Sequence, residues 1–325
     1  MKICVTGGNG FIGSWTVRKL VEHGHAVRCV LRPTSRTQRI DDLPFERAIG
    51  DVCDAESLRS AMSGCDATIH LAAPGGWEAD DRALLRRVIE GGTHNVVSAA
   101  ETLAAHRVVV VSSTAAINAS DAPRLFDEQS DFTVRDELLA YALAKHRAEV
   151  ITMSACSRGV NAVIVNPSEV YGPNDTALCT ANNLIDIATS TPVLACRGGT
   201  SVVHVEDVAN GIVAALTRGR AGQRYILGGE NLEIRQLAAL VLELIGRQAR
   251  IVMIPNAVIR PIARVAMRWR LPLPFNPYVA LYATRYWFVD NSKARRELGL
   301  SFRGARSTLS DTIDWLRQSG RLRSD

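Results

Sequence analysis

A glycine-rich turn near the N-terminus limits the possible folds of this chain more than any other segment. The apolar run Lys2–Thr6 predicts a strand, and the apolar spacing over Ser14–His23 predicts a helix. Between them the sequence reads Gly7-Gly-Asn-Gly-Phe-Ile-Gly13. Glycine there allows a tight bend and lets a pyrophosphate approach the backbone at the positive end of the helix. An ordinary glycine turn is the alternative, but this position favours a dinucleotide site with the candidate contacts Gly7, Gly10, Phe11, Ile12 and Gly13.

The same alternation of strand and helix continues to about residue 165. Further strands are predicted at Ala26–Leu31, Ala67–Ala72, Arg107–Val111 and Asn161–Val165, and the clearest helices at Leu84–Ala104 and Leu138–Ser157. Val108–Val111 and Ala162–Val165 are apolar throughout, which is typical of parallel strands buried on both faces. The predicted fold class is therefore α/β, a Rossmann-type doubly wound parallel sheet.

The pattern changes after residue 165. A loop rich in Pro, Gly and Asn follows, then a strand and helix over Val202–Leu216 and a strand at Arg224–Leu227. From Asn231 onward the chain is mostly helical, with prolines between the helices. We assign residues 1–165 and 200–228 to a dinucleotide-binding domain, and 166–199 and 229–325 to a smaller, mostly helical C-terminal lobe that binds substrate.

The end of the second strand bears on the choice of dinucleotide. An NAD site usually places an acidic residue there, about 20 residues after the glycines, whereas this chain has Arg32, Ser35 and Arg36. Arginines could hold a 2′-phosphate, although a solvated loop is the alternative. The sequence favours NADP(H), with NAD(H) possible. Asp51 and Val52 follow the next strand and could contact the adenine, with simple capping as the alternative for Asp51.

Tyr141 and Lys145 form the clearest catalytic pair. They lie four residues apart in a predicted helix, and therefore share one face. A tyrosine hydroxyl ordinarily titrates near ~10, and a neighbouring ammonium should lower that pKa enough for acid–base work. Ser113 follows the strand at Arg107–Val111, where ligands of open α/β sheets bind. Its hydroxyl could orient the same substrate oxygen, with Thr114 as second choice.

The order of motifs along nearly the whole chain resembles the extended short-chain dehydrogenases/reductases. This superfamily includes the NAD-dependent epimerase/dehydratases and the dihydroflavonol-4-reductase-like enzymes. The similar segments are Thr6–Gly13, Gly50–Val52, His70–Ala73, Val111–Ala116, Tyr141–Lys145, Asn166–Pro173, Val203–Ala209, Tyr225–Gly229, Phe288–Ala294 and Glu297–Gly299.

The resemblance implies a role for each matching residue. Tyr141 would be the acid–base, Lys145 would tune it and hold the cofactor ribose, and Ser113 would orient the substrate oxygen. Further cofactor contacts would be Leu71, Ala72, Ala73, Asn166, Pro167 and Ser168, and substrate contacts Pro74, Thr114, Glu169 and Val170. Relatives are often dimers, so the resemblance makes a homodimer possible. Two departures stand out: Ile89–Thr93 lacks an Asn that many relatives have, and Asn118 replaces a usual Gly.

Three functions fit these residues. The first is an NADP(H)-dependent enzyme that interconverts a ketone or aldehyde and an alcohol by hydride transfer. The second is a nucleotide-sugar epimerase or dehydratase that retains NAD. Dehydration is disfavoured, because Thr114-Ala-Ala116 lacks the carboxylates that such enzymes use. The third is a non-catalytic NADP(H) sensor, which would be expected to lack the Tyr–Lys pair.

Two features of the second lobe could concern substrate binding or contact with a membrane surface. Val258–Leu271 places Arg260, Arg264 and Arg268 on one helical face, and a helix there should start only at Pro261. A solvated arginine face is favoured over a helix on a membrane surface. The aromatic residues should mostly be core, and a few could line a flat apolar pocket: Trp269, Phe275, Tyr278, Tyr282, Tyr286 and Trp287.

Charge, cysteine content and hydropathy exclude several other classes of protein. The net charge of +5 is scattered without a basic run, so a nucleic-acid partner is not expected. The seven cysteines contain no Cys-x-x-Cys pair and favour free thiols over disulfides or a metal site. No apolar run reaches the ~18 residues of a membrane span, and the first residues do not resemble a signal peptide. We therefore expect a cytoplasmic enzyme.

Overall fold

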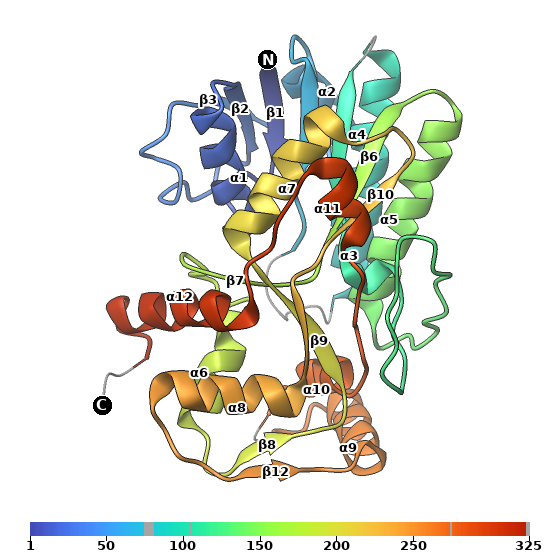
Figure 1. Ribbon diagram of the computed structural model, residues 1–325. Helices are drawn as coiled ribbons and strands as arrows, with labels where there is room; N and C mark the ends of the chain where they lie inside the picture. The colour runs from blue at the N-terminus through green and yellow to red at the C-terminus, as the bar shows by residue number, and fades with distance from the viewer. Residues whose placement is uncertain (75–80, 104–105, 274, 323–325) are drawn as a thin grey trace.

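The structure is a computed structural model that describes residues 1–74, 81–103, 106–273 and 275–322. Within these ranges the centre is a seven-stranded sheet with the order β10-β6-β5-β4-β1-β2-β3 (Figure 1). Every neighbouring pair in it is parallel. The strands are β1 Lys2–Thr6, β2 Ala26–Leu31, β3 Glu46–Ile49, β4 Ala67–His70, β5 Arg107–Val111, β6 Asn161–Pro167 and β10 Arg224–Leu227. This order reverses direction beside β1, which creates the crevice where such folds bind ligands.

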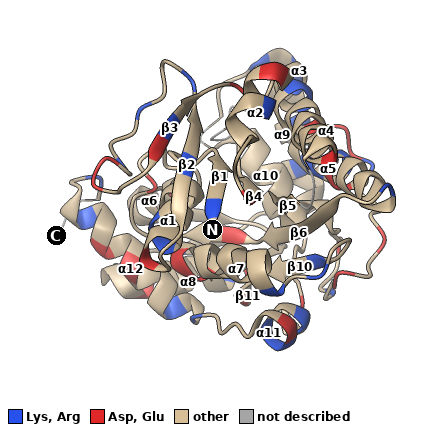
Figure 2. Cartoon of the chain, turned by 90° about the horizontal axis from the view of Figure 1, so that it is seen from above, with Lys and Arg blue, Asp and Glu red and all other residues tan. Residues whose placement is uncertain are grey.

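Helices cover both faces of the sheet, as the doubly wound prediction requires. On one face lie α1 Phe11–Glu22, α7 Val205–Arg218 and α11 Ser292–Leu298; on the other lie α2 Ala55–Met62, α4 Gly92–Thr102 and α5 Ala140–Ser157. Successive side chains of a strand point to opposite faces. Val109 and Val111 of β5 accordingly join the first core, whereas Val108 and Val110 join the second. Figure 2 shows the charged residues mainly on the surrounding helices and loops.

The long helix predicted over Leu84–Ala104 is present in a modified form. It consists of α3 Arg82–Leu85, a π-helical turn over Arg86–Gly91, and α4. Ala104, its predicted end, lies outside the described residues. The widened turn coincides with the segment in which the family's usual Asn is missing.

The smaller lobe contains two short sheets and several helices. One sheet joins β7 Glu169–Tyr171, β9 Gly199–His204 and β11 Glu230–Glu233, and the other pairs β8 Val193–Ala195 with β12 Ile251–Met253. The helices are α6 Ala181–Thr189, α8 Ile234–Ile245, α9 Asn256–Trp269, α10 Pro277–Ala283 and α12 Ala305–Gln318. Within residues 200–228, β9 pairs with the smaller lobe, whereas α7 and β10 pack on the large sheet.

The prediction that a helix could start only at Pro261 is wrong. Helix α9 begins at Asn256 and includes Pro261 in its interior. Proline removes one backbone donor, but Ile259, Ala263 and Ala266 of the same helix are buried. Their burial against the lobe outweighs the lost hydrogen bond. Within the described ranges, none of the seven cysteines forms a disulfide, and no helix is long and apolar enough to cross a membrane.

Candidate active site

The glycine turn has the close contacts that only glycine permits. Gly7 adopts a left-handed conformation with φ of +71°, and its carbonyl accepts a hydrogen bond from Gly10 N at 3.0 Å. A Cβ atom on Gly13 would lie 2.0 Å from the Gly7 carbonyl oxygen, and one on Gly7 would lie 2.8 Å from Ala72 N. The first turn of α1 therefore lies directly on the end of β1.

Helix α1 begins without a side-chain cap for its free N–H groups in the part of the chain that the structure describes. Its first turn contains no acidic residue. Gly10, Phe11, Ile12 and Gly13 line a cavity of about 1460 Å³ that extends between the two lobes. Uncapped N–H groups and the positive helix end suit a phosphate group.

The end of the cavity beside β2 and β3 contains basic side chains. Arg32, Ser35, Asp51 and Val52, which were predicted to contact the adenosine part of a cofactor, all line this end. Arg36 does not; its carbonyl instead accepts a hydrogen bond from the Asn9 amide at 2.9 Å. Asp51 also accepts a hydrogen bond from Cys53 N, which is the capping role considered for it.

Two further arginines at this end were missed by the sequence reasoning. Arg39 lines the cavity and donates to the carbonyl oxygens of Asn9 and Asn174, each at 3.1 Å. Arg87, from the π-helical turn, also lines the cavity. Neither follows a recognisable motif. The only sequence signal for Arg39 is its place in an arginine-containing loop.

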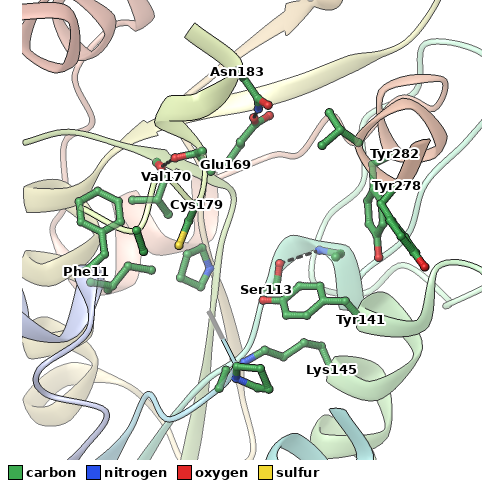
Figure 3. A pocket seen from close by; sticks show the side chains of 18 of the residues that line it. Phe11, Ser113, Tyr141, Lys145, Glu169, Val170, Cys179, Asn183, Tyr278 and Tyr282 are labelled. Atoms are coloured by element: carbon green, nitrogen blue, oxygen red, sulfur yellow. Dashed lines mark hydrogen bonds between the residues drawn. The ribbon is translucent and has the colours of Figure 1, made fainter. Parts of the chain in front are cut away.

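Ser113, Tyr141 and Lys145 come together at the centre of the cavity, as predicted (Figure 3). Ser113 directly follows β5 and caps the short helical turn Thr114–Ala116, accepting a hydrogen bond from Ala115 N at 3.2 Å. Tyr141 and Lys145 lie one turn apart on α5. The Lys145 ammonium lies 5.8 Å from the centroid of the Tyr141 ring and donates to the Val111 carbonyl at 2.8 Å.

The protonation of this pair differs from the prediction. Burial raises the pKa of Tyr141 to about 12, and its hydrogen bond with Ser113 offsets this only in part. Burial also lowers the pKa of Lys145 to about 8, while the Glu149 carboxylate acts in the opposite direction. The expected lowering of the tyrosine pKa is therefore wrong for the protein without cofactor. In the protein without cofactor the ammonium donates to the Val111 carbonyl, and burial of the hydroxyl dominates the pKa of Tyr141.

Asn166 and Glu149 form a buried hydrogen-bond network next to the Tyr141–Lys145 pair. Asn166 is fully buried and does not line the cavity, contrary to its predicted contact with the cofactor. Its amide donates to the Ser113 carbonyl at 2.9 Å and to Glu149 Oε1 at 2.5 Å. Glu149 also contacts Arg224 at 3.3 Å. This network connects the serine loop, α5 and β10, and Glu149 was not found from the sequence.

The departure at Asn118 has a structural explanation. Its amide donates to the Asp131 carbonyl at 2.6 Å, and its oxygen accepts from Thr133 Oγ1 at 3.1 Å. Asn118 therefore connects the serine loop to the loop that precedes α5.

The end of β6 and the residues that follow it form the wall opposite the tyrosine. Pro167, Ser168, Glu169 and Val170 all line the cavity, as do Leu71, Ala72, Ala73, Pro74 and Thr114. The Ser168 hydroxyl is buried without a hydrogen-bond partner in the described part of the chain. A buried polar atom of this kind favours a ligand that supplies the partner. Together with the uncapped α1 and the Gly13 contact, it fits a bound nicotinamide dinucleotide.

Beyond the tyrosine, one side of the cavity carries four aromatic side chains, and we call it the aromatic wall. Phe275, Tyr278, Tyr282 and Trp287 line it, and Figure 3 shows Tyr278 and Tyr282 on the side of Tyr141 away from Cys179. Tyr282 stacks on Trp287 with ring centroids 5.3 Å apart. Tyr286 is buried and Trp269 is exposed, and neither lines the cavity.

A polar group faces the aromatic side chains across the cavity. Glu169 lines this end and accepts hydrogen bonds from Tyr171 Oη at 2.6 Å and Asn183 Nδ2 at 2.9 Å. Asn183 also lines the cavity and was not found from the sequence. A ligand here would meet flat apolar surfaces on one side and this hydrogen-bonded group on the other.

Comparison with known proteins places this geometry in a family. The model of the NAD dependent epimerase/dehydratase family matches residues 3–228. A Synechocystis protein with the provisional name dihydroflavonol 4-reductase is 32% identical, over 98% of this chain and 96% of its own. A 4-hydroxy-2-methyl-3-oxo-4-farnesyl-3,4-dihydroquinoline-1-oxide ketoreductase from Stigmatella aurantiaca is also 32% identical, over 98% and 97% of the two chains. The crystal structure of gox2253 superposes with a TM-score of 0.86 at 33% identity, covering 99% of both chains.

Proposed function

The chain belongs to the NAD-dependent epimerase/dehydratase family and is an NAD(P)-dependent oxidoreductase. From this premise we propose that it reduces a ketone or aldehyde on an apolar, ring-containing substrate, with NADPH as the preferred cofactor. The single observation that supports this most is the joint position of Ser113 and Tyr141, which both face the cavity where the aromatic wall begins.

The residues around the tyrosine suit proton donation to a substrate oxygen. A nicotinamide dinucleotide bound along the glycine turn would supply the hydride. Tyr141, with its pKa at about 12, carries its proton at neutral pH and donates it to the carbonyl oxygen. Ser113 donates a hydrogen bond to the same oxygen and orients it. The alcohol forms when the carbonyl carbon has gained the hydride and the oxygen has gained the tyrosine proton, and solvent then restores the proton of Tyr141.

Lys145 has two tasks in this proposal. Its ammonium, 5.8 Å from the ring centroid, stabilises the tyrosinate that remains after proton transfer. It would also bond the cofactor ribose, as the family resemblance implies. Because its pKa is about 8, the ammonium form predominates at neutral pH.

Arginines at the adenosine end support the preference for NADPH. Arg32 and Arg39 line the cavity where the ribose 2′ position would lie, and no acidic residue follows β2 directly. Guanidinium groups bind phosphate through paired, charge-assisted hydrogen bonds. NADH lacks the 2′-phosphate and would gain nothing from them.

The substrate class follows from the aromatic wall. Phe275, Tyr278, Tyr282 and Trp287 offer flat apolar surfaces that suit a ring system better than a nucleotide sugar, whose diphosphate would require positive charge. The names of two relatives, a ketoreductase of a farnesylated dihydroquinoline oxide and a dihydroflavonol reductase, agree with such a substrate.

The proposal is tested with the purified protein, NADPH and a panel of ring-containing ketones and aldehydes. We expect continuous NADPH oxidation with at least one of them, formation of the alcohol, and loss of this activity in Tyr141→Phe. Conversion of a nucleotide sugar without net NADPH oxidation, and no reduction of any carbonyl, would instead establish an epimerase.

A further inference from the structure

Helix α9 exposes an apolar stripe to solvent. Val258, Ile262, Val265 and Trp269 are 47%, 44%, 50% and 72% exposed, respectively. Their spacing of four, three and four residues puts all of them on one face of the helix. Leu271, just past the helix end, is 51% exposed. We call these five residues the α9 stripe. Contiguous exposed apolar side chains of this size mark interaction sites more often than isolated ones do.

The orientation of α9 is fixed by its other faces. Ile259, Ala263 and Ala266 are buried in the lobe. Arg260 contacts Asp121 at 2.5 Å, and Arg264 contacts Asp136 at 2.6 Å. These arginines bond the loop before α5 and do not form the freely solvated face that the sequence favoured. The apolar residues therefore remain outward, and a rotation that would bury them would break both ion pairs.

The chain segment that contains the stripe is rich in arginine and lacks acidic residues. Between residues 244 and 289 the sequence has no Asp or Glu and seven arginines, namely Arg247, Arg250, Arg260, Arg264, Arg268, Arg270 and Arg285. Arg268 and Arg270 flank Trp269 and are exposed, and Arg268 lies 5.9 Å from the Trp269 ring centroid. Neither has an acidic partner in the described ranges, so their charges are available to an anionic surface.

We propose that the α9 stripe docks the protein on a membrane surface that contains anionic lipid. Helix α9 would lie along the interface with the five apolar side chains among the upper acyl chains, and Arg268 and Arg270 at the level of the lipid phosphates. Tryptophan favours this region because its ring is both apolar and polar. A second copy of the chain fits less well, because a two-fold contact through the same face would bring Arg268 and Arg270 of both copies together.

The position of α9 connects this docking to the cavity. It lies at the end of the smaller lobe that is remote from the N-terminus (Figure 1). The chain continues from Leu271 toward Phe275 and Asn276, which line the cavity. The docked protein would hold this side of the cavity close to the bilayer, where apolar ligands are concentrated. The docking itself requires neither NADPH nor catalysis, so it can be tested apart from the proposed reaction.

The test uses co-sedimentation of the full-length protein with vesicles. One set is phosphatidylcholine alone, and the other contains phosphatidylglycerol in addition. We expect the protein to bind the anionic vesicles, and the binding to weaken as salt is raised. Bromine-labelled acyl chains should quench part of the tryptophan fluorescence in wild type, and quench less in Trp269→Phe.

Matched variants separate the stripe from a general effect of charge. Val265→Glu should lower binding about tenfold, since burial of a valine contributes about that factor. Val150→Glu places the same change on α5 at a similar exposure of 55% and should have no effect. Arg268→Gln and Arg270→Gln should each weaken binding roughly fivefold. NADPH binding and circular dichroism confirm that each variant is folded.

Three results would overturn the inference. Wild type could remain in the supernatant with both vesicle types. Val150→Glu could weaken binding as much as Val265→Glu does. Lastly, wild type could form an oligomer that Val265→Glu dissociates while neither binds vesicles, which would make the stripe an interface between copies.

Discussion

Replacement of Gly13 by alanine tests the cofactor site with one added methyl group. A Cβ atom there would lie 2.0 Å from the Gly7 carbonyl oxygen, and ordinary contact begins at 3.4 Å. The nearest atoms belong to the backbone of Gly7 and Gly8, which cannot rotate away as a side chain could. Because a close-packed interior offers no free space, α1 and the turn must separate by roughly 1.4 Å. The helix N-terminus then moves away from the phosphates. Loss of one charge-assisted hydrogen bond costs about 1.5–3 kcal/mol, which is a roughly 10- to 100-fold weaker Kd for NADPH.

The assay is a fluorescence titration with NADPH, and Gly91→Ala is its matched control. Gly91 is also helical, lies outside the cavity lining, and would place its Cβ 3.7 Å from the nearest atom, the Arg86 carbonyl oxygen. We expect its Kd to equal that of wild type. Denaturant unfolding without cofactor should show an overpacking cost of about 1–3 kcal/mol in Gly13→Ala. Wild-type affinity in Gly13→Ala would refute the reasoning, since the phosphates could then not lie at this turn.

Three further predictions concern the chemistry and the choice of cofactor. Tyr141→Phe should lower kcat by roughly 10²- to 10⁴-fold with an unchanged Kd for NADPH, because only the proton donor is lost; steady-state kinetics and titration measure the two quantities. Arg32→Ala and Arg39→Ala should each weaken NADPH binding at least roughly tenfold and leave NADH binding nearly unchanged, which parallel titrations will show. The rate of reduction should fall as pH rises through about 8, because Lys145 loses its proton there while Tyr141, at about 12, keeps its own. A kcat profile against pH should show this descending limb in wild type and not in Lys145→Arg, whose guanidinium stays charged.

Each of these predictions has an outcome that contradicts it. Near-normal turnover in Tyr141→Phe would remove the tyrosine from the reaction. Equal losses of NADPH and NADH binding in the arginine variants would mean that these side chains shape the loop and bind no 2′-phosphate. A flat pH profile in wild type would show that Lys145 keeps its proton throughout the range.

The central strands of the sheet could be predicted from local sequence because they are buried on both faces. Val108–Val111 is apolar at every position, which few other elements tolerate, and β5 matches its predicted bounds. Strands such as β7 at Glu169–Tyr171 and β8 at Val193–Ala195 have only three residues, too few to show a period. Pro261 misled the prediction of α9 because a local rule cannot weigh the burial of Ile259 against one lost hydrogen bond.

The site residues could be predicted where they lie next to elements that the sequence pattern itself locates. Ser113 and the Tyr141–Lys145 pair lie at ends of elements that the pattern locates. Arg39 could not be found this way, because its place depends on contacts with Asn174, 135 residues away. The predicted lowering of the pKa of Tyr141 was wrong for a related reason. This pKa depends on how deeply the tertiary structure buries the hydroxyl, which the spacing of residues along a helix does not specify.

The nucleotide that accompanies the purified protein tests the central proposal most directly. Freshly purified protein is denatured, any released nucleotide is identified by mass spectrometry, and the cofactor-free protein is then titrated with NADPH and NADH. A reductase that exchanges its cofactor in every turnover predicts no stoichiometric nucleotide and much tighter binding of NADPH than of NADH. One NAD⁺ retained per chain, with no preference for the 2′-phosphate, would contradict it and indicate an epimerase that returns its hydride to the same substrate.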